Sequence, residues 1–237
     1  MNKFLMYFLF SIAFVFSDEI KIKISDLINY DRTLEELVDP KKLDDISLVI
    51  SKKHHIAYFV QGNRILKSYP VAMSYNYMND KERQGDEGVP EGVYYITAKA
   101  SGRIFFKFSP INYPNIKDAE KALENGIINK EEYRRIVEAN RRRASIIPST
   151  GAGYAIGIHG STCKEIDCLG VGELKSDTFI IIDWTLGCIA FNNRDLDEIL
   201  RYMRVWRTPI YILKEIKLEE IENIKEYLRG ILQEEVK

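Results

Sequence analysis

The chain has 237 residues, of which 46% are apolar and 29% are charged, the balance of a globular protein that can bury a sizeable core. Lysines and arginines number 34 against 35 aspartates and glutamates, so the formal net charge is −1. This balance argues against a nucleic-acid binder that works through bulk positive charge, although a local basic patch is not excluded. No apolar run reaches the roughly 18 residues of a membrane-spanning helix, and no fixed repeat indicates a solenoid.

The N-terminus has the layout of a secretory signal peptide. Lys3 precedes an apolar stretch from Phe4 to Phe16, and Ser17 then leads into the acidic Asp18. A positive start, a short apolar run and a small residue at the cut are the three parts of such a signal. We therefore expect residues 1–17 to be a signal peptide of a protein exported to the periplasm or cell wall, with no stable membrane span after processing. The alternative is a buried N-terminal helix.

Short strands dominate the part of the chain that follows. Residues 18–46 are charged and mixed, and we interpret them as a leader that packs on the main domain. Two strand-like runs, Leu48 to Val60 and Arg64 to Ser74, flank a turn at Gly62 and predict a hairpin. Further strands are expected at residues 93–97, 103–108, 154–159, 178–183 and 208–213. This spacing of short strands is typical of a mostly-β fold.

Helical patterns interrupt the strands and follow the last one. Residues 117–145 contain two helical segments, and Asn129 and Glu132 have the spacing of a capping box at the start of the second. A helix is also predicted at residues 195–204, and an amphipathic helix within residues 214–237 is expected to cover the β core. We interpret residues 117–145 as a helical pair inserted between strands.

Two glycine-containing stretches carry the side chains that are suited to chemistry. His159 precedes Gly160, and Cys188 follows Gly187, each beside a predicted strand. A cysteine attacks as the thiolate, and a nearby histidine can take its proton. Gly187 would let the backbone turn before Cys188, so that neighbouring N–H groups face a developing oxyanion. The alternative is a buried cysteine that packs as a small hydrophobe, with His159 as a core residue.

These stretches are similar to the signature of the L,D-transpeptidase catalytic domain, the YkuD type. That family has a His-Gly pair and then [Ser/Thr]-x-Gly-Cys-aliphatic, which here match His159-Gly160 and Thr185-Leu186-Gly187-Cys188-Ile189. Asn193 matches an asparagine that commonly follows. Residues 85–94 resemble the upstream Gly-Asp…Thr-Pro-x-Gly-x-Tyr signature, with Val89 in place of threonine. The resemblance covers roughly residues 48–213.

The resemblance implies a fold and its boundaries. We expect a mostly-β, L,D-transpeptidase-like β-sandwich with the inserted helical pair and a C-terminal amphipathic helix. The catalytic domain would span residues 47–213, with the helical insert at residues 117–145 and the C-terminal helix at residues 214–237.

The resemblance also implies an activity and a site. The chain is expected to be an exported cysteine L,D-transpeptidase that acts on peptidoglycan stem peptides, without a cofactor, a metal or nucleic acid. Cys188 would form the acyl-enzyme, His159 would be the base, and Gly160 would orient His159 through its carbonyl. The residues expected to hold the oxyanion or the substrate are Gly187, Thr185, Tyr154 and Asn193.

Two departures from the family pattern concern the substrate. Leu186 stands where the family commonly has histidine, and Ala190 stands where arginine is frequent. The exact stem peptide and the acceptor therefore stay open. An amine acceptor would give a cross-link, whereas water would make the chain an L,D-carboxypeptidase or amidase. His54 and His55 lie far from the motifs and are not expected to take part in catalysis.

The cysteines give two further expectations. Because three cysteines in an oxidising compartment leave one unpaired, we expect a Cys163–Cys168 disulfide and a free Cys188. A different class of protein would use His159 and the three cysteines as a structural zinc site. A third possibility is a non-catalytic cell-wall binding module that keeps the fold.

The insert is expected to cover the site. It precedes the His159 strand in sequence and ends in Arg141, Arg142 and Arg143. Such a basic end is either a solvated helix terminus or a group that meets the carboxylates of a peptide stem. We therefore predict that residues 117–145 form a cap over the cleft between Cys188 and His159.

Overall fold

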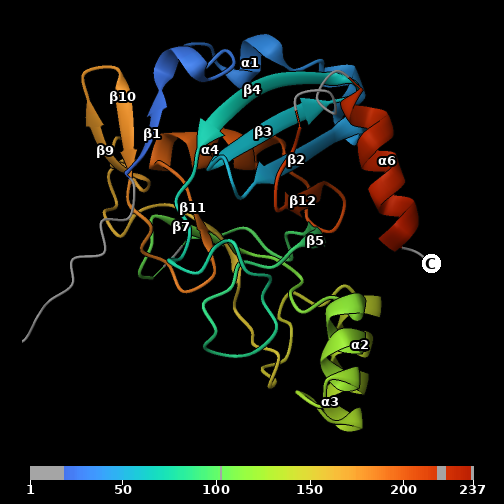
Figure 1. The fold of residues 1–237 in the computed structure, drawn as a ribbon. Coiled ribbons are helices and arrows are strands. Elements are labelled where there is room, and N and C mark those ends of the chain that lie inside the picture. The colour runs from blue at the N-terminus through green and yellow to red at the C-terminus, as the bar shows by residue number, and fades with distance from the viewer. Residues whose placement is uncertain (1–18, 102, 218–222, 236–237) are drawn as a thin grey trace, which may run out of the picture.

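The computed structural model describes residues 19–101, 103–217 and 223–235 (Figure 1). The expected signal peptide at residues 1–17 lies outside the described residues and stays a prediction. Within the described ranges, no helix is long and apolar enough to cross a membrane.

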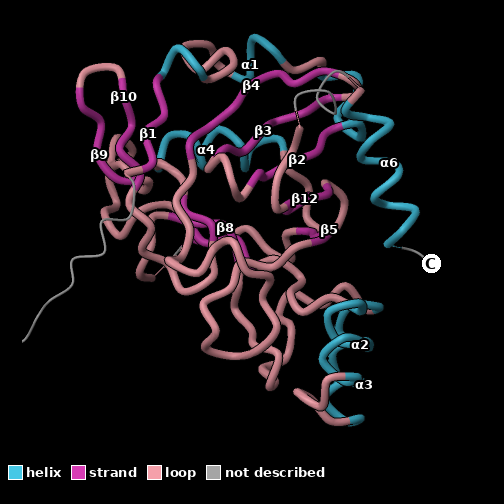
Figure 2. The backbone as a smooth tube through the Cα atoms, in the orientation of Figure 1, coloured by secondary structure: helices cyan, strands magenta, loops and turns pink. Residues whose placement is uncertain are grey.

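The strands of the described residues form three sheets (Figure 2). The largest has the order β4-β3-β2-β12-β5, from strands at Ile46–Ser51 (β2), Ile56–Gln61 (β3), Arg64–Pro70 (β4), Gly92–Tyr95 (β5) and Pro209–Leu213 (β12). The second has the order β11-β8-β7-β6, from Ala100–Ser101 (β6), Lys107–Pro110 (β7), Gly157–His159 (β8) and Ile189–Ala190 (β11). The third has the order β1-β10-β9, from Ile20–Lys23 (β1), Gly172–Lys175 (β9) and Thr178–Ile181 (β10).

The helices lie around these sheets. Their bounds are Leu34–Leu37 (α1), Ile116–Glu124 (α2), Lys130–Arg141 (α3), Asn193–Tyr202 (α4) and Ile224–Glu235 (α6), with 3-10 turns at Ile24–Asp26 and Pro40–Asp45. Of the expected leader, residues 19–46 are described and pack on the rest of the chain, because β1 pairs with β10 and the α1 residue Leu34 is fully buried in the main core.

The main core lies between the five-stranded sheet, the four-stranded sheet and α4. Leu48 of β2 packs in one cluster with Ile158 of β8 and Leu196 of α4. The intervening residue Val49 faces the other side of the sheet, where it shares a cluster with Ile224 of α6. This alternation is the period-2 pattern of a strand whose two faces are both covered. The mostly-β sandwich with a C-terminal helix over its outer face is confirmed.

The register of the four-stranded sheet positions the two motifs. β11 runs parallel to β8, with Ile189 opposite Ile158 and Ala190 opposite His159. On its other side β8 pairs with β7, where Phe108 lies opposite His159. Because Cys188 directly precedes β11, this pairing brings it to the strand that carries His159.

Two predicted strands differ from those in the structure. The run from Leu48 to Val60 is split by a turn at residues 52–55, where Lys52 is buried in an ion pair with Glu91 (Nζ–Oε1 2.8 Å) and His55 has a positive φ of 53°. The expected strand at residues 103–108 begins only at Lys107. In both places a segment with β-type composition instead turns to carry a side chain into the interior or into a cleft.

The inserted helices pack on each other and project from the body of the fold (Figure 1). The capping box at α3 is confirmed: the Asn129 side chain accepts a hydrogen bond from the Glu132 amide (3.0 Å), and the Glu132 carboxylate accepts one from the Asn129 amide (2.9 Å). Ala119, Ala122 and Ile136 form most of the buried cluster between the helices. The two helices therefore bury their apolar faces mainly against each other.

The helical pair also holds the segment that returns to β8. The Glu132 carboxylate accepts a hydrogen bond from the Gly151 amide (3.2 Å), and Arg135 donates one to the Ser149 carbonyl (3.1 Å). Ala152 is buried in the same cluster as Ile136. The insert thus acts as a support for residues 149–153.

This support predicts a difference between two isoleucines of the same region. Ile136→Ala should lower the free energy of unfolding by about 2–5 kcal/mol, because Ile136 is fully buried between the helices and the cavity left behind cannot close. The control Ile146→Ala, at a residue 79% exposed, should change it by less than about 0.5 kcal/mol. Urea denaturation followed by circular dichroism measures both; equal effects would contradict the packing described.

Candidate active site

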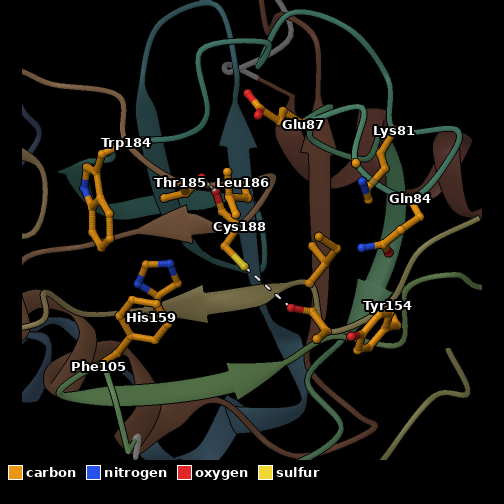
Figure 3. Close-up of a pocket in the computed structure, with 13 residues that line it drawn as sticks. Lys81, Gln84, Glu87, Phe105, Tyr154, His159, Trp184, Thr185, Leu186 and Cys188 are labelled. Carbon is orange, nitrogen blue, oxygen red and sulfur yellow. Dashed lines mark hydrogen bonds between the residues drawn. The ribbon is translucent and has the colours of Figure 1, made fainter.

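Cys188 and His159 line the same cleft, which has a volume of about 490 Å³ (Figure 3). Trp184, Phe105 and His159 lie toward one side of it, whereas Lys81, Gln84 and Tyr154 lie toward the other. Thr185, Leu186 and Cys188 lie between the two sides. The cleft therefore has an aromatic wall beside the imidazole and a more polar wall opposite.

Cys188 follows a turn that only glycine suits. Gly187 has a φ of 120°, and a Cβ there would lie 2.7 Å from the Gly88 carbonyl oxygen. The turn leaves Cys188 half-buried, with its thiol directed toward the Ala155 carbonyl at an Sγ–O distance of 3.7 Å (Figure 3). The thiol proton is thus engaged by a backbone carbonyl in this state.

His159 is held in one tautomer and one orientation. Its Nδ1 lies 2.7 Å from the Gly160 carbonyl oxygen and donates to it, so Nε2 is left as the proton acceptor. The Phe105 ring stacks on the imidazole at 3.9 Å, and the Trp184 ring meets it edge-on at 5.3 Å. A Cβ on Gly160 would lie 2.3 Å from the Asn193 Oδ1, which explains the glycine after the histidine.

Burial keeps both groups neutral. It lowers the pKa of His159 to about 4, against the opposing hydrogen bond with Gly160. It raises the pKa of the Cys188 thiol to about 11, although a hydrogen bond from the Gly157 backbone and the positive charge of Lys81 act in the opposite direction. At neutral pH the cleft therefore holds a thiol and an imidazole, and not a thiolate–imidazolium pair.

Three more of the expected site residues lie at or directly beneath the cleft. Tyr154 is 46% exposed on its wall. Thr185 lines it while its hydroxyl donates to the Cys188 carbonyl (2.7 Å), so it fixes the backbone of that residue. Gly187 is buried in the turn beneath them.

Asn193 makes its side-chain contacts within the protein. It is fully buried, its Oδ1 accepts from the Ser161 amide (2.8 Å), and its amide donates to the carbonyls of Cys163 (2.9 Å) and Glu165 (2.6 Å). In this structure its side-chain polar atoms all bind the loop that follows Gly160, and the expected contact with substrate or oxyanion stays a prediction.

The disulfide is confirmed. Cys163 is bonded to Cys168, with a Cα–Cα distance of 6.1 Å, and Cys188 is a free thiol. The zinc alternative is therefore wrong, since two of its four ligands are used by the disulfide. The described residues also contain no other group of three or more potential ligands close enough for a metal ion.

The expected cap over the cleft is also wrong. None of the described residues of α2 and α3 lines the cleft. Arg142 pairs with Glu138 of its own helix (2.6 Å), and Arg143 lines a separate hollow with Asp44 and Trp206. The physical reason is that the two helices pack on each other, and their arginine-rich end then lies away from the cleft.

Several cleft residues were not predicted from the sequence. Lys81, whose side chain is 3% exposed, is paired with Asp86 (2.7 Å), and Gln84 and Glu87 lie on the same loop. The upstream signature at residues 85–94 could have indicated this loop, as Trp184 could have been inferred from its position beside Thr185. Phe105 carries no local signal, because only the pairing of β7 with β8 brings it to His159.

The neutral state of the thiol predicts its reactivity. Alkylation of Cys188 by iodoacetamide should accelerate with pH up to an inflection near pH 11, because burial disfavours the thiolate. Cys163 and Cys168 are bonded to each other, so iodoacetamide does not label them. Mass spectrometry of samples quenched across the pH range measures the rate. An inflection below pH 7 would mean a resting ion pair with His159 and would contradict the geometry.

Comparison with known proteins gives a family match. The profile of the L,D-transpeptidase catalytic domain, YkuD, matches residues 45–212. The comparison with curated proteins gave no match.

Similar solved structures include Bd1075 of Bdellovibrio bacteriovorus, with 18% identity, a TM-score of 0.44, and coverage of 80% of this chain and 56% of that chain. The helical cell shape determining protein Pgp2 from Campylobacter jejuni has 18% identity and a TM-score of 0.44, with coverage of 78% and 55%. The L,D-transpeptidase from Xylanimonas cellulosilytica has 10% identity and a TM-score of 0.38, with coverage of 70% and 59%. The chain thus spans little more than half the length of these proteins. Since the family profile matches well over half of its residues, the chain belongs to the L,D-transpeptidase catalytic domain family.

Proposed function

We propose that the chain is an exported cysteine L,D-transpeptidase that acts on peptidoglycan stem peptides through a Cys188 acyl-enzyme, with His159 as the base. The observation that carries this proposal is a free thiol that lines the same cleft as an imidazole whose Nδ1 is bonded to the Gly160 carbonyl at 2.7 Å. Family membership supports the substrate class. The signal-like residues 1–17 support export.

The first half of the reaction uses both groups as neutral species. As the thiol sulfur attacks the carbonyl carbon of the L,D-peptide bond, His159 Nε2 takes the thiol proton. The imidazolium then returns this proton to the leaving amine as the carbon–nitrogen bond breaks, which leaves a thioester on Cys188. Gly160 serves the step by keeping Nδ1 protonated and Nε2 free.

The second half resolves the thioester. An acceptor amine loses a proton to His159 Nε2 and attacks the thioester carbonyl, and the Cys188 sulfur leaves and is reprotonated. The product is a cross-link between two stems. Both steps need only the thiol and imidazole, so no cofactor enters the mechanism.

Water is a second candidate acceptor, favoured by the open cleft. None of the described residues of α2 and α3 lines the cleft, so the inserted helices do not shield a thioester there from solvent. With water as the acceptor, the same residues would act as an L,D-carboxypeptidase or amidase. A non-catalytic wall-binding module is less favoured, because such a module has no need of a free thiol and an oriented imidazole in the same cleft.

One experiment tests the activity and the acceptor together. Incubation with purified muropeptides, followed by mass spectrometry, should give cross-linked dimers or trimmed monomers from the native chain. Cys188→Ala should give neither while remaining folded, because it removes the nucleophile from a half-buried position. His159→Ala should slow turnover by about 10²–10⁴-fold, the usual contribution of a general base. Full activity of Cys188→Ala would end the proposal.

The buried imidazole also sets the pH profile. His159 must be unprotonated to accept the thiol proton, so kcat/KM should fall with acidification only as the pH passes through about 4, the pKa to which burial lowers this group. An ordinary histidine would give the same loss near pH 6.5. Initial rates in buffers from pH 3 to 9, with folding checked by circular dichroism, measure this acid limb of the pH–rate profile. A limb near pH 6.5 would contradict the buried environment.

A further inference from the structure

We propose that His55 and Asp183 form a buried positioning pair that sets the geometry of both Cys188 and His159. His55 lies in the turn before β3, far in sequence from either motif, and is fully buried. Its Nε2 lies 3.0 and 3.2 Å from the two carboxylate oxygens of Asp183 and donates to them. Asp183, whose side chain is 9% exposed, stands two residues before Thr185.

The Asp183 carboxylate ties two backbone segments together. Besides His55 it accepts a hydrogen bond from the Met73 amide (2.6 Å). The Met73 carbonyl in turn accepts from the amides of Trp184 (2.8 Å) and Thr185 (3.0 Å). The carboxylate and this carbonyl therefore clamp residues 183–185 to the strand-like segment around Met73.

From this clamp, contacts run to both reacting groups. The Trp184 ring packs edge-on against the His159 imidazole at 5.3 Å. The Thr185 hydroxyl donates to the Cys188 carbonyl at 2.7 Å. These contacts are made by the two residues that follow Asp183, so a shift of Asp183 would move the support of the imidazole and the turn that carries Cys188 together.

The surroundings of His55 indicate that its polar function is this one contact. Among the described residues, its Nδ1 has no hydrogen-bond partner, and the Tyr77 ring meets the imidazole edge-on at 4.4 Å. Burying a polar ring with one nitrogen unsatisfied is costly. An apolar residue would fill the same space without that cost, and what it would lack is a donor for the Asp183 carboxylate.

The test compares four variants of the full chain in two assays. The first assay is turnover of muropeptides, which rests on the proposed function. The second is the rate of Cys188 alkylation by iodoacetamide at pH 8, which does not. His55→Leu removes the donor, His55→Gln restores an N–H near the Nε2 position, and Asp183→Asn keeps the volume but removes the charge. His54→Gln, at the neighbouring half-buried histidine, whose Nδ1 contacts the Ser51 hydroxyl (2.9 Å), is the matched control.

His55→Leu and Asp183→Asn should lower kcat by about 10–100-fold with little change in KM, because a misplaced nucleophile loses chemistry before it loses binding. They should also speed alkylation by about tenfold, the effect of lowering the thiol pKa by one unit when the turn loosens and its burial is relieved. His55→Gln should restore both values, and His54→Gln should alter neither. A general loss of stability would also lower turnover and speed alkylation, so the recovery of both rates in His55→Gln, with each variant shown to be folded by circular dichroism, is the result that assigns the effect to the positioning pair.

The outcomes separate the two proposals. If the native chain turns over no muropeptide, the proposed function fails, and the alkylation assay still tests the positioning pair. If His55→Leu does not fold, Asp183→Asn carries the test. A folded His55→Leu or Asp183→Asn with native rates in the alkylation assay, or a His55→Gln that restores neither rate, would overturn the positioning pair.

Discussion

The site depends on one short parallel pairing. β11 and β8 share two residue pairs, Ile189 with Ile158 and Ala190 with His159, and this register brings the Cys188 thiol and the His159 imidazole from separate parts of the chain to one cleft. A slip of one residue would turn His159 to the opposite face of its strand. The register is held by the core, since Ile158 and Ile189 are both fully buried there. Packing of aliphatic side chains thus fixes the chemistry.

Burial around that pairing has a second consequence, which is electrostatic. The same environment that orders His159 and Cys188 disfavours charge on either, so the cleft stores no ion pair at rest. In the mechanism proposed above, charge would develop only when the proton moves between them, in a site where hydrogen bonds and dipoles are already arranged. The aromatic rings of Phe105 and Trp184 add to this by excluding water from the imidazole while leaving Nε2 free.

The features that could be predicted from the sequence are those that depend on contacts between residues close together in the chain. The contact of the Gly160 carbonyl with His159 and the capping box at Asn129 depend on neighbours within a few residues, and the structure contains both contacts. The contacts of Asn193 and the position of the inserted helices depend instead on how segments far apart in the sequence pack together. Neither could be derived locally: Asn193 turns inward to satisfy loop carbonyls, and the inserted helices satisfy each other first.

The insert is nevertheless connected to the nucleophile. The Glu132 carboxylate of α3 accepts a hydrogen bond from the Gly151 amide. Four residues further along the chain, the Ala155 carbonyl accepts one from the Cys188 thiol. Ala155 has a φ of 55°, unusual for a residue with a side chain, so the segment is held in that shape by its supports. The described residues of these helices do not line the cleft, yet the helices support one of its walls. The Cys188 thiol therefore depends on a contact supported from the insert, and the His159 imidazole on its contact with Trp184.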